Sequence, residues 1–295
     1  MTLQLLFDLG GPVMDDTGVE PARAHYGFCA ASRSGIYERM REAAARISPD
    51  GARALGSLDS GAFAEIYDDA KRRLKKLAKE AEAYSDVNRV AMVMAVSAGL
   101  QDYKSLVQDL TEEEVQRFWE ELCPNVEEEV YKGINAEFFN VTSEILARWQ
   151  DARLHLVTDN WPQFYLGAIE PALRRRIGEA KGRAKRAPEF AYRRMSDREE
   201  TRSRAYISGE GWGNKANPET WGRILNDLGA GHMDTVIFVD DSARKLRGLQ
   251  RYAEESRLVV PVLVHFRKDE EGETDLTMER ISNIREMTGL VENYA

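Results

Sequence analysis

Cysteine, histidine and long apolar runs are all scarce in this sequence. Two of the 295 residues are cysteine and four are histidine, which is too few for a disulfide framework and leaves no zinc-type ligand spacing. No apolar run approaches the roughly 20 residues of a membrane span, and the first residues lack the basic region and apolar core of a signal peptide. We therefore expect a cytoplasmic protein without a membrane partner, in which any bound metal has oxygen ligands.

The overall composition is that of a globular protein. Hydrophobic residues make up 43% and charged residues 31% of the chain, and the length is sufficient for two domains. The formal net charge of −9 argues against attraction of nucleic acid to the whole surface, although an average can conceal a local basic patch.

Asp8 follows a short apolar strand. The residues before it are Leu-Gln-Leu-Leu-Phe, and Gly10 and Gly11 come shortly after it. Open α/β sheets place their chemistry at the carboxyl ends of buried strands, where loops carry the functional groups. Asp8 is therefore a candidate functional residue, although the same carboxylate would also serve to cap a following helix.

A long helical block comes next. Between residues 60 and 84, apolar residues recur at three- and four-residue spacing, which predicts one amphipathic helix. The segment 48–51, Ser-Pro-Asp-Gly, is expected to be a turn that closes the helical stretch before it, and Pro124 is expected to end a helix that begins after Thr111. We expect residues 17–130 to form a separate, all-helical cap domain.

The rest of the chain alternates strands and helices. Apolar strands are predicted at residues 153–160, 206–208, 235–241 and 258–266. Continuous apolar strands separated by helices indicate a parallel sheet covered on both faces. The predicted fold class is therefore α/β, with a Rossmann-like parallel sheet formed by residues 1–16 and 131–295 and an inserted helical cap.

Several of these strands end in groups that suit phosphate chemistry. Asp8, Thr158 and the pair Asp240 and Asp241 end three of them, and Lys215 lies on a loop before a predicted helix. The carboxyl ends of neighbouring parallel strands share one edge of a sheet, so these side chains can converge. Carboxylates suit magnesium, and a hydroxyl with an ammonium group suits phosphoryl oxygens. The alternative for Asp240 and Asp241 is that they only end a strand and cap the next helix.

Four segments resemble the ordered motifs of the haloacid dehalogenase (HAD) superfamily. They are Phe7-Asp8-Leu9-Gly10-Gly11, Leu156-Val157-Thr158-Asp159-Asn160-Trp161, Ile207-Ser208-Gly209-Glu210 with the later Lys215-Ala216-Asn217-Pro218, and Val236-Ile237-Phe238-Val239-Asp240-Asp241-Ser242. They cover about half of the chain, and the helical block lies where many members insert a cap. The resemblance implies a hydrolase and, in the phosphatase branch, Mg²⁺-dependent hydrolysis of an organic phosphate monoester, with a phosphorylated small molecule as substrate.

The resemblance also implies a role for each matching residue. Asp8 matches the nucleophile that forms an aspartyl-phosphate, Thr158 the hydroxyl that binds a phosphoryl oxygen, and Lys215 the lysine that neutralises negative charge. The implied Mg²⁺ ligands are Asp8, the backbone carbonyl of Gly10, Asp240 and Asp241. The implied substrate-binding residues are Thr158, Asp159, Asn160 and Gly11.

Gly10 is the main departure from the pattern of the superfamily. Most of its phosphatases have a second aspartate there, which protonates the leaving group and then activates water. A missing general acid and base typically costs about 10² to 10⁴ in rate. Asp15, Asp16 and His25 are candidates for its replacement, with the alternative that each is a solvated loop residue.

Two further departures are Asp159, where Asn is expected, and Lys245, where Asp or Asn is frequent. Dehalogenases of the superfamily use the same nucleophile without a metal, and paired acids such as Asp240 and Asp241 would repel their anionic substrate unless a cation intervened. A phosphatase is therefore favoured over a metal-independent, dehalogenase-type hydrolase. The other hypothesis is a catalytically impaired member that binds nucleic acid or a protein.

Residues 172–204 form a basic insertion that suits the second hypothesis. Between Pro171 and Ala205 there are 12 basic and 5 acidic residues, of which Arg204 is the last basic one, and this excess predicts a positive face. Phe190 and Tyr192 lie among the bases, as suits stacking on a nucleotide or a single strand of nucleic acid. A solvated helical hairpin that pairs with the acidic cap, and a grip on a polyanionic small molecule or a second protein, remain alternatives. The oligomeric state is open.

Overall fold

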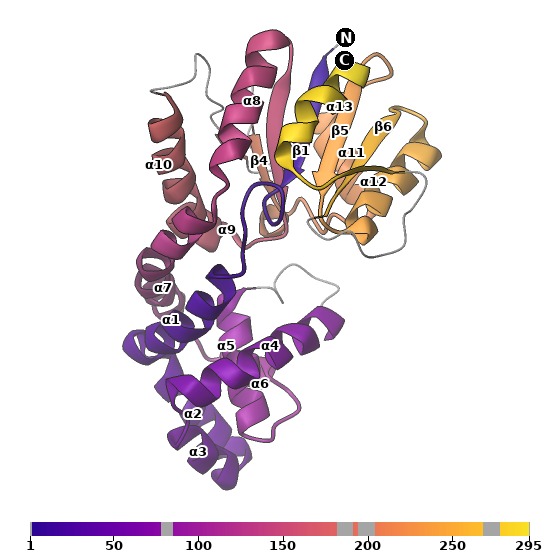
Figure 1. Ribbon diagram of the computed structural model, residues 1–295. Helices are drawn as coiled ribbons and strands as arrows, with labels where there is room; N and C mark the ends of the chain where they lie inside the picture. The colour runs from indigo at the N-terminus through magenta and orange to yellow at the C-terminus, as the bar shows by residue number, and fades with distance from the viewer. Residues whose placement is uncertain (1, 78–84, 182–190, 194–203, 268–277, 295) are drawn as a thin grey trace. The chain divides into compact units, whose positions relative to one another are not determined.

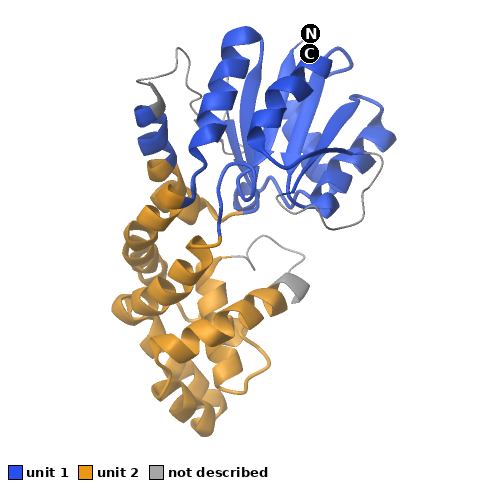
Figure 2. Cartoon of the chain, in the orientation of Figure 1, with its two compact units in different colours: residues 1–16, 133–159, 173–295 blue, residues 17–132, 160–172 orange. Residues whose placement is uncertain are grey.

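A computed structural model describes residues 2–77, 85–181, 191–193, 204–267 and 278–294. The chain forms two compact units (Figure 2). Unit 1 consists of residues 1–16, 133–159 and 173–295, and unit 2 of residues 17–132 and 160–172. Part of the basic insertion, including Phe190 and half of its basic residues, lies outside the described residues.

Unit 1 is built on a seven-stranded sheet in which every pairing is parallel. Its strands are β1 (Leu3–Asp8), β2 (Arg153–Thr158), β3 (Ala191–Arg193), β4 (Arg204–Ile207), β5 (Thr235–Asp240), β6 (Pro261–Phe266) and β7 (Glu279–Ile281). The order across the sheet is β3-β4-β2-β1-β5-β6-β7, with β1 at the centre (Figure 1). The first strand of the chain thus lies between two strands that come much later in the sequence.

Helices cover both faces of this sheet. They are α8 (Ala136–Arg148), α11 (Pro218–Leu228), α12 (Ala243–Ser256) and α13 (Met287–Tyr294). Helix α10 (Glu170–Lys181) begins in unit 2 and continues in unit 1. Leu6 and Phe238 belong to a buried cluster that also contains Trp221 of α11. Phe7, which alternates with Leu6 along β1, packs on the opposite face against Phe138 of α8, with ring centroids 5.0 Å apart. The predicted α/β class with a parallel sheet covered on both sides is therefore confirmed.

The strand bounds differ from the prediction at the edges of the sheet. β6 begins at Pro261, because Leu258 and Val260 remain exposed on the way into it. The short strands β3 and β7 are not predicted from the sequence. A three-residue strand carries too little alternation to be distinguished from a loop.

Every element assigned within the described residues of unit 2 is helical. These helices are α1 (Val19–Ser34), α2 (Ile36–Ile47), α3 (Pro49–Gly56), α4 (Ser60–Leu77), α5 (Asp86–Ser97), α6 (Lys104–Val107), α7 (Glu112–Gly133), α9 (Pro162–Phe164) and the π-helical turn η2 (Tyr165–Ile169). The helix predicted for residues 60–84 is described as far as Leu77, and its last residues lie outside the described part.

Two helix boundaries predicted in this block are wrong. Ser48 does not begin a turn: it is the N-cap of α3, and its hydroxyl accepts a hydrogen bond from the Gly51 amide at 3.1 Å. Pro124 does not end α7, which continues to Gly133. The buried side chains of Val126 and Val130 extend the apolar face beyond the proline, and this packing offsets the loss of one helical hydrogen bond.

Unit 2 contains a buried network of charged side chains. Arg23 donates to Asp86 at 2.9 and 3.0 Å, and Arg89 lies 3.5 Å from both Asp86 and Glu20. The hydroxyl of Tyr67 also donates to Asp86, at 3.2 Å. Burial of such charges is tolerated only when each is paired and hydrogen-bonded. The network therefore fixes α1, α4 and α5 in one arrangement.

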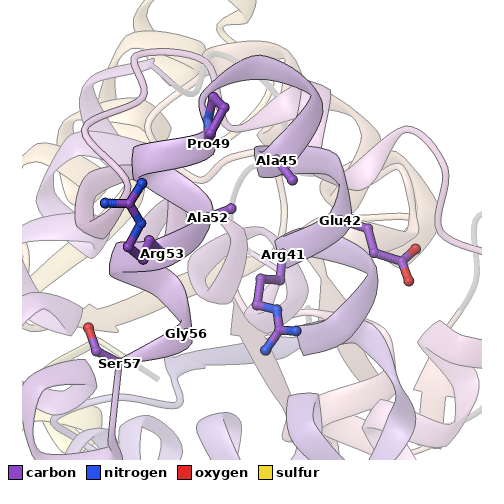
Figure 3. Close-up of a pocket in the computed structure, with 8 residues that line it drawn as sticks. All are labelled: Arg41, Glu42, Ala45, Pro49, Ala52, Arg53, Gly56 and Ser57. Carbon is purple, nitrogen blue, oxygen red and sulfur yellow. The ribbon is translucent and has the colours of Figure 1, made fainter.

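A surface pocket of about 650 Å³ lies between α2 and α3 (Figure 3). Two arginines line it, and each is already in an ion pair within its own helix, Arg41 with Glu38 and Arg53 with Asp50. The pocket contains none of the residues that the sequence suggests for chemistry. None of the described helices combines the length and apolar character that crossing a membrane requires.

Candidate active site

Three of the predicted residues end adjacent strands of the sheet. Asp8 is the last residue of β1, Thr158 of β2 and Asp240 of β5, and β1 pairs with both of the others. The side chains of all three are buried. Because β2 and β5 lie on opposite sides of β1, this edge is the point where the strand order reverses, which is where open α/β sheets bind ligands.

Lys215 brings a buried ammonium group to the same place. Its side chain is fully buried, and Nζ forms an ion pair with Asp8 Oδ1, lies 2.9 Å from Asp240 Oδ2 and donates to the Val157 carbonyl at 3.2 Å. An ammonium group has three protons, and three oxygen atoms accept them here. Lys215 therefore links the ends of β1, β2 and β5 through one cation.

The backbone around Lys215 is fixed from two sides. Trp221 of α11 donates its indole N–H to the Lys215 carbonyl at 2.7 Å. Gly248 of α12 packs so closely that a Cβ atom at that position would lie 2.1 Å from the same carbonyl oxygen. Only glycine allows the helix to approach the loop so closely. The position of the ammonium group thus depends on two helices that have no catalytic residue at these positions.

Asp240 and Asp241 occupy different environments. Asp240 is fully buried and its Oδ1 accepts the Ser242 amide at 2.8 Å, whereas Asp241 is exposed. Burial, and then the negative charge of Asp8, raise the pKa of Asp240 to about 7 and that of Asp241 above its usual value. Burial and the charge of Asp8 thus disfavour ionisation of Asp240 and Asp241.

These carboxylates could hold a divalent metal. Asp8, Asp240 and Asp241 each offer an oxygen atom within 4.8 Å of the others. Hard cations such as Mg²⁺ and Ca²⁺ take oxygen ligands. Burial, and then repulsion by Asp8, raise the pKa values of Asp240 and Asp241, and a bound cation would offset both effects. The donor set therefore fits the predicted metal site.

Gly11 permits a close approach between two loops of the site. Its φ is +85°, in the left-handed region that favours glycine. A Cβ at this position would lie 2.9 Å from Asp241 Cβ, which is closer than two such atoms can approach. Any larger residue at position 11 would displace Asp241. The predicted role of Gly11 in binding a substrate is not tested by this geometry.

The two unexpected residues Asp159 and Lys245 contact each other. Lys245 Nζ, in the first turn of α12, lies 3.1 Å from Asp159 Oδ2 and 3.6 Å from Asp8 Oδ2. The Ser208 hydroxyl donates to Asp159 Oδ1 at 2.7 Å. Although burial opposes ionisation, the charges of Lys245 and then Lys215 lower the pKa of Asp159 to about 2, and nearby carboxylates raise that of Lys245 well above its usual value.

The roles of two residues at this site, Lys245 and Ser208, are therefore not predicted from the sequence. Lys245 reads as a departure from a pattern, yet it supplies a second cation beside Asp8. Ser208 reads as the end of a strand, yet it orients Asp159. The opposite charges of the two departures, Asp159 and Lys245, were the available signal. Asn160 is half-buried and begins the second segment of unit 2, whereas the other predicted site residues belong to unit 1.

The basic insertion is only partly described. Arg174 and Arg175 are exposed on α10, but the side chains of Tyr192 and Arg193 and the segments around β3 lie outside the described residues. Arg204 does not belong to a positive face: it is buried, and its guanidinium lies 2.7 Å from Asp227 Oδ2. Its place in β4 explains this, because all four residues of that strand are buried.

The fold and the site together define a parallel α/β protein with an aspartate and a lysine at the switch point of its sheet.

No family model matches the chain, and no curated protein matches its sequence. Solved structures do match it over their whole length. The 2-haloacid dehalogenase from Pseudomonas syringae pv. Tomato is 14% identical, with 100% of both chains covered and a TM-score of 0.50. YfnB from Bacillus subtilis, described as a HAD hydrolase and bound to magnesium, is 13% identical, with 99% of both chains covered and a TM-score of 0.52. The chain thus has the fold of the haloacid dehalogenase superfamily.

Proposed function

We propose that this protein is a hydrolase that cleaves an organic phosphate monoester, with Asp8 as the nucleophile and Mg²⁺ as the cofactor. The observation that supports the proposal is the contact of Asp8 with a fully buried ammonium group, Lys215, beside a cluster of three carboxylates. Covalent catalysis by a carboxylate requires the nucleophile to be ionised and positioned. Lys215 contacts Asp8 Oδ1 and supplies a positive charge beside it.

Each of two lysines lies beside a different oxygen of the Asp8 carboxylate. Lys215 holds Asp8 Oδ1, while Lys245 lies 3.6 Å from Asp8 Oδ2. Attack on a phosphoryl group brings additional negative charge to this point, and preorganised cations stabilise it strongly where water is excluded. Thr158, buried at the end of β2, is the proposed hydroxyl for a phosphoryl oxygen. When bound, Mg²⁺ would supply the positive charge that offsets repulsion between the carboxylates and the substrate.

The acidic cluster also favours the phosphatase over a dehalogenase-type hydrolase. Both P. syringae dehalogenase and YfnB share the fold, so the fold does not discriminate. A metal-independent enzyme gains nothing from Asp240 and Asp241 beside its nucleophile, because they repel an anionic substrate. We therefore favour the reaction that makes use of a cation at this cluster.

Release of phosphate from a panel of phosphate esters tests this proposal. We expect release by the wild-type protein with Mg²⁺, none with a chelator, and a decrease of about 10⁴-fold or more for Asp8→Asn. Asp151→Asn is the matched control, because Asp151 is exposed just before β2, at the other end of that strand. Hydrolysis that survives both chelation and Asp8→Asn would refute the proposal.

A calorimetric titration with Mg²⁺ alone tests the metal site separately. We expect binding to the wild-type protein and to Asp151→Asn, and at least tenfold weaker binding to Asp241→Asn, since one carboxylate ligand is removed. Equal affinity in all three proteins would place the ion elsewhere.

A further inference from the structure

A carboxylate from outside the predicted motifs lies beside the nucleophile loop. A Cβ atom placed on Gly10 would be 4.0 Å from Asp8 Oδ2 and 4.0 Å from Asp16 Oδ2, and these are the nearest atoms to it. The space that a side chain at position 10 would enter is therefore bordered by the nucleophile and by Asp16. Both residues belong to unit 1.

Backbone hydrogen bonds hold Asp16 near this space. The chain folds back after Gly11, whose amide donates to the Met14 carbonyl at 2.9 Å, and the Met14 amide donates to Leu9 at 2.8 Å. The next residue, Asp15, donates to the Gly133 carbonyl at 2.9 Å. The position of Asp16 is thus set by a closed loop that is anchored to the rest of unit 1.

The chemical properties of Asp16 differ from those of the other acids. Asp8, Asp159 and Asp240 each contact a lysine, whereas within the described part of the chain no hydrogen bond or ion pair engages the Asp16 carboxylate. It is exposed and is not a member of the three-carboxylate cluster. A carboxyl group near a reacting centre that is neither a metal ligand nor paired with a cation is suited to proton transfer.

We propose that Asp16 is the general acid and base of the reaction proposed above, on which this inference rests. As the bond between Asp8 and phosphorus forms and the ester bond breaks, the Asp16 carboxyl gives its proton to the departing alkoxide oxygen. The resulting carboxylate then takes a proton from a water molecule as the water oxygen attacks phosphorus and the Asp8–phosphorus bond breaks. The sum is one ester and one water converted to one alcohol and one phosphate, with Asp8 and Asp16 regenerated.

The test uses the full chain with Mg²⁺ and p-nitrophenyl phosphate, whose leaving group departs without a proton. For Asp16→Asn we expect a rapid burst of p-nitrophenol close to one equivalent per enzyme, followed by turnover about 10² to 10⁴ slower than wild type. The burst arises because the phosphoenzyme forms but water is no longer activated. Phenethyl phosphate, whose alkoxide needs a proton, should give no burst. Asp15→Asn, the neighbouring exposed acid, should remain within about threefold of wild type.

A second variant distinguishes proton transfer from a structural role. The φ angle of Gly10 is not in the left-handed region, and the atoms nearest to a Cβ placed there are the two carboxylate oxygens at 4.0 Å. A Cβ atom therefore fits at position 10 without a clash. We expect Gly10→Asp to restore turnover at least tenfold in the Asp16→Asn background and to give no comparable gain in the wild-type background, because Asp16 already supplies the function there.

Each other outcome overturns the inference. Asp8-dependent turnover that is unchanged by Asp16→Asn would remove Asp16 from the reaction. Loss of the burst together with turnover would show that the phosphoenzyme no longer forms, as expected for a structural residue. Both outcomes leave the proposed phosphatase intact. A large gain for Gly10→Asp in the wild-type background would show that no residue now supplies the function. Absence of Asp8-dependent turnover in every variant would overturn both proposals.

Discussion

Asp159 and Lys245, two residues that depart from the superfamily pattern, form an ion pair with each other. Taken separately, each replaces a residue that the superfamily pattern favours. Together they form an ion pair of 3.1 Å between side chains that are 17% and 20% exposed. The Asp159 carboxylate is stabilised in this buried place by the positive charge of Lys245. Lys245 also brings an ammonium group near Asp8.

The pair predicts a non-additive double-mutant cycle. Removing one partner leaves the other, largely buried charge without the opposite charge that lies 3.1 Å from it, whereas removing both leaves neither charge. We expect Asp159→Asn and Lys245→Gln each to lower the free energy of unfolding by more than the double variant does, with a coupling of about 1 to 3 kcal/mol. Urea denaturation of the four proteins measures this, and additive effects would contradict it.

His155 predicts a pH dependence of stability. It is fully buried in β2, its Nε2 lies 3.0 Å from Gln4 Oε1, and burial and then the positive charge of Arg204 lower its pKa to about 3. Between pH 6.5 and 3 the unfolded chain binds a proton at this residue that the folded protein does not bind, so stability falls as the pH falls through this window.

The expected size of this effect is about 2 kcal/mol between pH 6.5 and pH 5. The measurement is the free energy of unfolding against pH for wild type, His155→Gln and, as control, His232→Gln, since His232 is exposed. His155→Gln should flatten the slope in this window, and His232→Gln should not. Identical slopes in the three proteins would refute the assignment.

At the scale of elements, the close contact of Gly248 with the Lys215 carbonyl indicates that α12 positions Lys215. A methyl group there would overlap the Lys215 carbonyl. We expect Gly248→Ala to lower the free energy of unfolding by about 1 to 3 kcal/mol through overpacking and to reduce hydrolysis by displacing Lys215.

Gly289→Ala is the matched control for this variant. Gly289 lies in α13 and a Cβ there meets no atom within 4 Å, so alanine should raise the free energy of unfolding by about 0.5 to 1 kcal/mol. The test is to measure thermal unfolding and phosphate release for both variants and to compare each with the wild-type protein. Equal stability of the two would show that α12 can move away from the loop.

The sequence predicts the central elements well and their contacts poorly. β1, β2 and β5 are predictable because each is a continuous apolar run that stops at a polar residue, and the parallel order then brings Asp8, Thr158 and Asp240 to one edge. The passage of α7 through Pro124 is not predictable from local propensity, because burial of later residues of the helix decides it. The same holds for Gly248, whose role exists only once α12 packs on the Lys215 loop.

At the scale of the whole molecule, the distribution of charge predicts a second kind of binding. Arg174 and Arg175 are exposed on α10, at the start of the basic insertion. We expect single-stranded DNA to bind this region at low ionic strength and to be released by salt, as counterion release requires. Arg174→Gln with Arg175→Gln should weaken binding several-fold in a fluorescence anisotropy titration and leave phosphate release unchanged.

Asp8→Asn is the complementary control for this experiment. It should abolish hydrolysis and retain the binding of DNA. Binding that is absent at low salt, or that is insensitive to the two arginines, would assign the basic segment to another role.

The central strand of the sheet has a consequence for synthesis of the protein. β1 leaves the ribosome before both of its neighbours in the sheet, which begin only at residues 153 and 235. At about 5 to 20 residues per second, β1 waits roughly 7 to 30 s for β2, and longer for β5. Meanwhile residues 17–132, the larger segment of unit 2, have already been made. The apolar strand that ends in the proposed nucleophile therefore needs protection from misfolding and aggregation during translation until β2 and β5 have been made.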